Sequence, residues 1–264
     1  MTFNDWLQVA SELAKKTGDV ALRSYRKGIA FDLKRDQSPV TEADRAAERV
    51  AREWIAERFP DHGVIGEEYG ETRPDARLRW CIDPIDGTRS FIAGVPLWGT
   101  LIALCEGKHV LAGAASYPAI GELLAAANGE GCWSDGARCA VSKVDTIERA
   151  TVLTTDVTFK HQSPRRAGWM ELASRANTAR TWGDCYGYLL VATGRAEVMV
   201  DGMMMPWDAA PFVPIITEAG GVIVDYQARD AAFGDGCIAT NAALAGVTHE
   251  VLGVGTTRQN ADAS

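Results

Sequence analysis

The chain has 264 residues, of which 47% are hydrophobic, and its formal net charge at pH 7 is −8. Such a length and apolar content suffice for one large domain, or two smaller ones, around a buried core. The negative charge argues against sequence-independent nucleic-acid binding, which needs clustered Lys and Arg. We therefore expect no nucleic-acid partner, although an acidic protein can bind a phosphorylated substrate where metal cations supply local positive charge.

The cysteines and the apolar stretches indicate the compartment. The six cysteines show no CxxC pair and no ladder of spacings, which fits a reducing cytosol better than a disulfide framework. The N-terminus lacks an apolar signal-peptide core, and the most apolar stretch, 110–127, is interrupted by Gly, Pro and Glu. We expect a cytoplasmic protein without membrane contact.

Apolar residues at helical spacing, followed by Gly or Pro, predict two long helices in the first part of the chain. Segments rich in β-forming residues, separated by Gly and Pro, then predict an antiparallel meander. The expected elements are a helix over 4–27, a helix from about 38 to 59, short β segments around 64–65 and 79–82, and the meander over 97–133.

After about residue 140 the pattern alternates between β and α segments, which indicates a layered α/β arrangement. The expected elements are strands over 150–156, 179–182, 196–201, 221–226 and 237–241, and helices over 165–176, 184–193, 208–219 and 241–252. We therefore expect two halves, 1–140 with the metal-binding motifs and 141–254 with substrate-recognition residues. The tail, 255–264, is expected to be disordered.

Acidic residues gather where predicted β segments end. Glu67 and Glu68 follow GVIG, Asp83 and Asp86 stand in DPIDGT, and Asp208 stands in PWDAA. Mg²⁺ prefers oxygen ligands, usually a few carboxylates completed by water and substrate phosphate. Two such cations about 4 Å apart can clamp the attacking and leaving oxygens of a phosphoryl transfer. The alternative is that these acids are solvated turn residues and helix caps.

The DPIDGT motif carries geometric information. Pro84 has no N–H, so the strand ladder should end at or before it. Gly87 allows a close backbone approach, and DGTRS can open a helix whose N–H groups face an anion. The spacing of three lets both aspartates of the motif point into one cavity as the chain turns. For Asp208, the alternative to a metal ligand is a residue that caps the following helix. Asp44 lies inside a charged helix face, where an acidic residue is usually just solvated.

The segments GVIGEE, DPIDGT and PWDAAPF…TEAGG occur in this order, and together they resemble the inositol monophosphatase superfamily. The resemblance covers nearly the whole chain, to about residue 252. It implies the family's layered αβαβα sandwich, a homodimer, inhibition by lithium, and direct attack of a metal-activated water without a phosphoenzyme. It also implies two or three Mg²⁺ ions per site, with the ligands Glu67, Asp83, Asp86, Asp208 and the carbonyl group of Ile85.

The same resemblance implies catalytic and substrate-binding roles. Thr88 lies at the family's threonine that helps to orient the attacking water, and Asp44 lies at the acid that hydrogen-bonds this threonine. Together with Glu67 they form the expected catalytic set. The further residues are Gly87, Thr88 and Asp208, expected to contact the substrate, and Lys34, a loose match to a basic residue near the metal entrance.

The sequence after DPIDGT is similar to the histidinol-phosphate phosphatase branch of this superfamily, whereas inositol-type members more often continue with Thr-Asn-Phe. The stretches that carry this similarity are RSFIAGVPLWGTLIAL and RTWGDCYGYLLVATGRAEVMVD. We therefore expect hydrolysis of L-histidinol phosphate to L-histidinol and phosphate, a step of histidine biosynthesis.

The chemistry of histidinol supports this expectation, because its ammonium and imidazole call for carboxylates in the pocket. Asp184 opens a predicted helix, and Asp201 ends a predicted strand at a position that the family uses for substrate recognition. A hydrogen bond to a charged partner contributes about 1.5–3 kcal/mol, enough to discriminate between substrates. Helix capping is the alternative for Asp184, and core packing is expected for the methionines of MMMPW.

Other functions remain open. A haloacid-dehalogenase-type phosphatase would use an aspartate as a covalent nucleophile, but its two aspartates lie two residues apart, whereas those of DPIDGT lie three apart. An inositol-1-monophosphatase or broad sugar phosphatase would have the same site with a different pocket, and a non-catalytic acidic scaffold would bind no Mg²⁺ stoichiometrically. The motifs GxSxG, HExxH and GxxxxGK[ST] are absent, which leaves metals and water as the chemistry.

Overall fold

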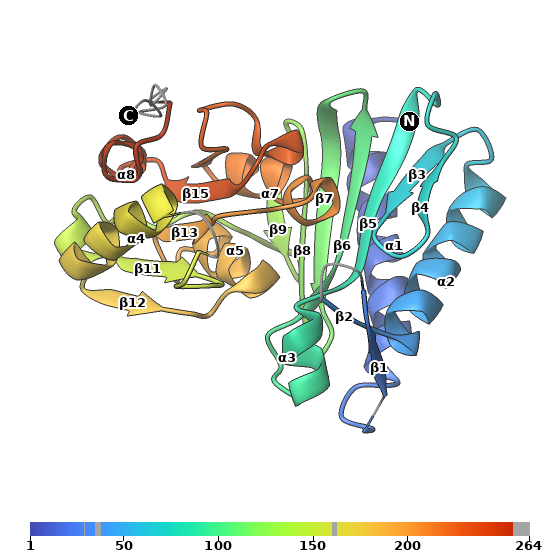
Figure 1. Cartoon of the computed structure of the whole chain (residues 1–264). Helices are drawn as coiled ribbons and strands as arrows, with labels where there is room; N and C mark the ends of the chain where they lie inside the picture. Colours follow the sequence, from blue (N-terminus) through green and yellow to red (C-terminus); the bar gives the residue numbers. More distant parts are fainter. Residues whose placement is uncertain (29, 35–37, 160–162, 256–264) are drawn as a thin grey trace, which may run out of the picture.

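The computed structural model describes residues 1–28, 30–34, 38–159 and 163–255 (Figure 1). Its helices are α1 (Phe3–Leu22), α2 (Glu42–Arg58), α3 (Thr88–Ala93), α4 (Ser163–Arg175), α5 (Asp184–Ala192), α6 (Pro206–Ala209), α7 (Phe212–Glu218) and α8 (Ala245–Leu252), with 3₁₀ turns at η1 (Ile147–Arg149) and η2 (Ala231–Phe233). Its strands are β1 (Phe31–Leu33), β2 (Pro39–Thr41), β3 (Gly63–Gly66), β4 (Gly70–Thr72), β5 (Leu78–Asp86), β6 (Gly99–Glu106), β7 (His109–Tyr117), β8 (Glu122–Ala127), β9 (Gly131–Ser134), β10 (Ala137–Arg138), β11 (Thr151–Thr154), β12 (Thr178–Arg180), β13 (Val198–Asp201), β14 (Gly221–Val224) and β15 (Cys237–Asn241).

The larger sheet of the described chain has eight strands, in the order β10-β9-β8-β7-β6-β5-β3-β4. Strands β6 to β9 pair antiparallel with their neighbours in sequence, which confirms the predicted meander. Helices α1 and α2 cover one face of this sheet because each buries an apolar stripe. Leu13 of α1 and Trp54 of α2 pack in one cluster with Trp80 and Ile102 of the sheet.

The smaller sheet of the described residues has five strands, in the order β12-β11-β13-β15-β14. Helices α5 and α7 lie between the two sheets, where Tyr188 and Phe212 share a core with Leu101 of the larger sheet and Met199 of the smaller one. Helices α4 and α8 cover the outer face of the smaller sheet. The resulting order of layers is αβαβα (Figure 1), which confirms the predicted fold class.

The prediction that the ladder ends at or before Pro84 is wrong. Strand β5 continues to Asp86, but its pairing with β6 shifts: Asp83 lies opposite Leu101 and Asp86 opposite Gly99. Three steps on β5 therefore match two steps on β6, which is a β-bulge. Pro84 is tolerated because it lies inside this irregularity, where no ladder N–H is needed.

Smaller differences have local causes. The hairpin of β1 and β2 and the strand β4 were not predicted, since each strand has only three residues. The predicted helix over 208–219 is divided into α6 and α7 at Pro211, and α1 ends at Leu22 instead of residue 27. The tail expected to be disordered lies, from residue 256 on, outside the described residues.

The two predicted halves share one core. The boundary near residue 140 falls between β10 and β11, yet the cluster between the sheets contains residues from both sides of it. The division into halves therefore stays a prediction. All six cysteines are free thiols. In the ranges that the structure describes, no helix is both long enough and apolar enough to cross a membrane.

Candidate active site

The bulge in β5 brings two aspartates to the same side of the chain. In a regular strand, residues three apart point to opposite faces, because side chains alternate. One extra residue in the bulge restores the parity between Asp83 and Asp86. Both carboxylates therefore meet that of Asp208, and one oxygen from each of the three residues lies within 4.8 Å of the others. The predicted convergence of far-separated acids is present.

Asp208 is not the N-cap residue of its helix, in contrast to the alternative that the sequence left open. It is the third residue of α6, and its Oδ2 accepts a hydrogen bond of 3.0 Å from the backbone N–H of Met205. This bond fixes the side chain at the start of the helix. The carboxylate has capacity left for a further partner, since each carboxylate oxygen offers two lone pairs.

The electrostatics of the cluster favour added positive charge. Burial, together with repulsion from Glu67, Asp86 and Asp208, raises the pKa of Asp83 well above its usual range. Burial and the Asp208 carboxylate raise the pKa of Asp86 to about 8, although the backbone N–H of Cys185 donates to its Oδ2. Burial likewise raises the pKa of Asp208 to about 7. Without a cation, these carboxyls therefore hold protons near neutral pH.

Glu67 lies beside this cluster, in the turn between β3 and β4. Its backbone N–H donates to the carbonyl of Ile82 at 3.2 Å, which ties the turn to β5. Its Oε1 accepts from the ammonium of Lys34 at 2.7 Å, and Lys34 also donates to Glu68 at 2.6 Å. Its Oε2 is buried and has no hydrogen-bond partner among the described residues. Lys34 thus lies at the acidic cavity, where the loose match placed it.

Thr88 and Asp44 lie together, as the resemblance implied. Asp44 is fully buried, and its Oδ2 accepts from both the N–H (2.8 Å) and the hydroxyl (2.5 Å) of Thr41, the N-cap residue of α2. Its Oδ1 is 3.5 Å from the hydroxyl of Thr88, whose shorter bond, 3.0 Å, goes to the carbonyl of Ile85. The interpretation of Asp44 as a solvated surface acid is therefore excluded.

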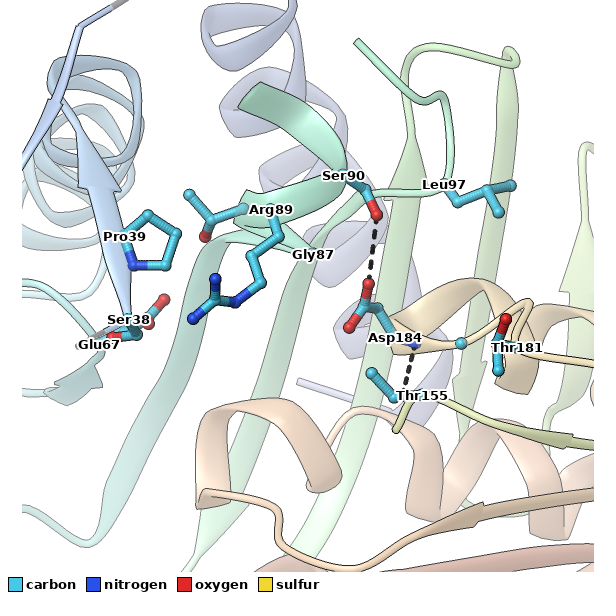
Figure 2. A pocket seen from close by; sticks show the side chains of 12 residues that line it. Ser38, Pro39, Glu67, Gly87, Arg89, Ser90, Leu97, Thr155, Thr181 and Asp184 are labelled. Carbon is cyan, nitrogen blue, oxygen red and sulfur yellow. Dashed lines mark hydrogen bonds between the residues drawn. The ribbon is translucent and has the colours of Figure 1, made fainter. Parts of the chain in front are cut away.

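Two adjoining cavities surround these residues. The larger, about 570 Å³, contains the acidic cluster, Lys34 and the methionines that precede α6. The smaller, about 390 Å³, contains Asp184 (Figure 2). Both are lined by Ser38, Glu67, Gly87 and Thr88, so that the two spaces share one wall. The smaller cavity therefore lies directly beside the one that contains the acidic cluster.

Asp184 lies at the junction of the two sheets. It is the first residue of α5 and adopts a left-handed φ of 50°. Its N–H donates to the hydroxyl of Thr155 at 2.8 Å, and its Oδ2 accepts from the hydroxyl of Ser90 at 3.4 Å (Figure 2). A Cβ at Gly87, whose φ is 84°, would lie 3.1 Å from this carboxylate. Asp184 therefore faces the cavity and does not cap α5.

The chain matches the model of the inositol monophosphatase family over residues 4–256. The chain belongs to this family. A histidinol-phosphatase of Chlorobaculum parvum is 45% identical over 241 residues, with 90% of this chain and 93% of that protein covered. One of Mycobacterium tuberculosis is 32% identical, with 91% and 95% covered. The solved inositol monophosphatase of Zymomonas mobilis has a TM-score of 0.86 at 30% identity, with 96% and 99% covered.

The residues of this family member fit a hard divalent cation. The converging groups are carboxylates, the ligands that Mg²⁺ prefers. Their raised pKa values and the unpartnered Oε2 of Glu67 both fit a site in which Lys34 alone does not balance the carboxylates. The residues that could hold such ions are those predicted: Glu67, Asp83, Asp86, Asp208 and the carbonyl of Ile85, all of which line the larger cavity.

Two predictions about side chains differ from the structure. Asp201 ends β13 but is buried; its oxygens accept from the N–H of Thr155 and the hydroxyl of Tyr188, and it lines neither of the two cavities. A substrate contact for Asp201 stays a prediction that this geometry does not favour. The core packing expected for the methionines is wrong for Met203 and Met205, which are 75% and 51% exposed and line the larger cavity.

Sequence reasoning missed several residues of the smaller cavity. They are Ser38, Pro39, Leu97, Thr155, Thr181 and Gly183. Single residues outside the motifs, such as Ser38, Thr181 and Gly183 in loops, carry no spacing signal of their own. The only available signal was position, since Thr155 lies near the end of a predicted strand and Gly183 precedes a predicted helix.

Proposed function

We propose that this protein is a Mg²⁺-dependent phosphomonoesterase that hydrolyses L-histidinol phosphate to L-histidinol and phosphate. The observation that carries the proposal is the acidic cluster of Asp83, Asp86 and Asp208 next to a second cavity that contains Asp184. The first part suits a phosphate held through dications, and the second suits a cationic organic group. The 45% identity to a histidinol-phosphatase supports the same substrate.

The proposed mechanism uses residues whose positions are described above. Glu67, Asp83, Asp86, Asp208 and the Ile85 carbonyl would hold two or three Mg²⁺ ions, which supply Lewis acidity when bound. The hydroxyl of Thr88 orients the attacking water, and Asp44 holds Thr88 from its buried side. Glu67 helps to aim this water, whose proton passes to solvent. Water attacks phosphorus directly, the ester P–O bond breaks, and the leaving oxygen takes a proton from solvent.

Asp184 gives the proposal its substrate preference. Burial and the Asp86 carboxylate raise the pKa of Asp184, so an ammonium that enters the cavity restores a favourable environment for the charged carboxylate. Such a bond contributes about 1.5–3 kcal/mol, or about 10- to 150-fold in affinity. A neutral polyol gains nothing comparable.

The decisive experiment is a phosphate-release panel with Mg²⁺. It compares L-histidinol phosphate, myo-inositol 1-phosphate, fructose 1,6-bisphosphate and 3′-phosphoadenosine 5′-phosphate. We expect the highest kcat/KM with L-histidinol phosphate. Asp184→Asn should raise KM for this substrate about 10-fold or more and leave KM for inositol phosphate nearly unchanged, with Asp145→Asn, on the exposed surface, as the control. Equal effects on both substrates would remove Asp184 from the substrate site.

The alternative within the same family is an inositol-1-monophosphatase or a broad-specificity sugar phosphatase. The similarity to the Zymomonas mobilis inositol monophosphatase supports it. Turnover of histidinol phosphate no faster than that of inositol phosphate would favour this alternative. Absence of stoichiometric Mg²⁺ binding in a calorimeter would instead favour an acidic scaffold without catalysis.

The expected setting of the enzyme also belongs to the proposal. We infer a cytoplasmic homodimer without nucleic-acid partners, in line with its negative charge. Light scattering coupled to size exclusion tests the dimer, because a single species of about twice the chain mass is expected.

A further inference from the structure

The turn between β3 and β4 carries Glu67 and rests on a buried carboxylate of α2. We propose that this carboxylate, Glu48, is a positioning residue: it fixes the backbone of the turn so that the side chain of Glu67 faces the metal cavity. The inference rests on the proposed metal-dependent function and deepens it.

Glu48 accepts hydrogen bonds from the backbone of the turn itself. It is fully buried, and its Oε2 accepts from the N–H of Glu68 at 2.7 Å, while its Oε1 accepts from the N–H of Tyr69 at 3.2 Å. Arg52, one turn later on α2, donates from Nε to Glu48 at 2.7 Å and also donates to the carbonyl of Gly70. Side chains of α2 therefore bond the two turn residues after Glu67 and the first residue of β4.

The residue before Glu67 is held by close packing. A Cβ at Gly66 would lie 2.0 Å from Oε1 of Glu48, so the carboxylate lies directly against the backbone of Gly66. Such an approach requires glycine at this position. Glu48 therefore contacts the chain on both sides of Glu67, at Gly66 and at Glu68.

Glu67 is held from the opposite side as well. Its N–H donates to the carbonyl of Ile82 of β5, next to Asp83, and its buried Oε2 has no hydrogen-bond partner among the described residues. The turn is therefore clamped between β5, which carries two of the acids, and α2. Groups that hydrogen-bond next to a metal ligand typically change metal affinity about 10- to 100-fold when they are mutated.

The chain offers a matched control. Asp225 is also fully buried; it accepts from the backbone N–H groups of Gln227 and Arg229 at 2.8 Å each, and from Nε of Arg229 at 2.9 Å. A Cβ at Gly234 would lie 2.5 Å from its Cβ. The chemistry is the same as at Glu48, but Asp225 lines neither the cavity of the acidic cluster nor the adjoining one.

The test compares Mg²⁺ binding by calorimetry in the wild-type chain, Glu48→Gln and Asp225→Asn. Gln keeps the length of the side chain but turns an N–H₂ toward N–H donors of the turn. We expect both variants to unfold at a lower temperature. The Mg²⁺ Kd should rise about 10-fold or more in Glu48→Gln and change less than about twofold in Asp225→Asn. Gly66→Ala, with Gly234→Ala as its control, should repeat this contrast.

Hydrogen exchange in the metal-free wild-type chain supplies a measurement that does not depend on how the variants fold. The amides of Glu68 and Tyr69 should be protected, and exchange at the rate of exposed amides would overturn the inference. A wild-type chain that binds no Mg²⁺ overturns the proposed function and this inference with it. Equal affinities in the wild type and Glu48→Gln, with the wild type binding, overturn only the role of Glu48.

Discussion

The acidic cluster predicts an unusual pH dependence of stability in the metal-free chain. Asp86 and Asp208 have pKa values of about 8 and about 7 in the folded chain, against 3.8 for an ordinary aspartate. Between pH 4 and 7 the folded chain therefore binds more protons than the unfolded chain. By linkage, the free energy of unfolding falls as the pH rises through this window, and the fall levels off above about pH 8.

The size of the effect follows from the number of groups. One carboxyl that is protonated only in the folded chain lowers the free energy of unfolding by about 1.4 kcal/mol per pH unit. Asp86 and Asp208 by themselves contribute at most about 2.7 kcal/mol per unit, since both are only half-buried and water screens part of the repulsion. Mg²⁺ at 100 times its Kd should raise the free energy of unfolding by about 2.7 kcal/mol.

Urea unfolding at pH 5, 6, 7 and 8, with EDTA or with excess Mg²⁺, measures both quantities. We expect stability to fall with pH in EDTA and to recover with Mg²⁺, most strongly at pH 8. Asp86→Asn should be more stable than the wild type in EDTA at pH 8, because an amide keeps the bond from the Cys185 N–H without the charge. Metal-free stability that stays constant or increases from pH 5 to 7 would refute the reasoning.

The remaining predictions concern catalysis. Asp83→Asn should lower Mg²⁺-dependent phosphate release by more than about 100-fold while the circular dichroism spectrum stays unchanged. Losing a group that hydrogen-bonds a metal ligand costs about 10- to 100-fold, and losing the ligand itself should cost more. Near-normal turnover would contradict the role of Asp83 as a ligand. Thr88→Ala should lower kcat about 100-fold because the hydroxyl that faces Asp44 is lost, whereas Thr88→Ser should retain most of the activity. Similar losses in both Thr88 variants would show that the methyl group, not the hydroxyl, matters.

Much of the site was predictable because its chemistry depends on acidic residues that gather at the ends of predicted strands, a pattern that indicates cation binding. Three acidic segments at strand ends predicted a shared cation site, and the structure brings Asp83, Asp86 and Asp208 within 4.8 Å. A layered α/β arrangement followed from the alternation of β and α segments along the chain, whereas the order αβαβα came from the resemblance to the inositol monophosphatase superfamily. Both inferences depend on local sequence, where patterns are strongest.

The features that were missed depend on contacts between distant residues. Glu48 reads as one more charged residue of a helix, and only the amides of Glu68 and Tyr69, about 20 positions later, explain its burial. The position of Pro84 correctly indicated an interruption, but whether the strand ends or bulges is decided by its pairing with β6. The exposure of Met203 depends likewise on a cavity that other segments form.

The way in which the cluster is assembled has an energetic consequence. Asp83 and Asp86 come from the larger sheet, whereas Asp208 comes from α6 and the amide that donates to Asp86 comes from α5. Packing of Tyr188 and Phe212 between the sheets therefore forces together carboxylates that repel one another. Apolar burial opposes this repulsion in the metal-free chain, and dications would remove it. The ions proposed for catalysis should consequently also strengthen the contact between the two sheets, so that metal removal loosens α5 and α6 before it loosens the meander.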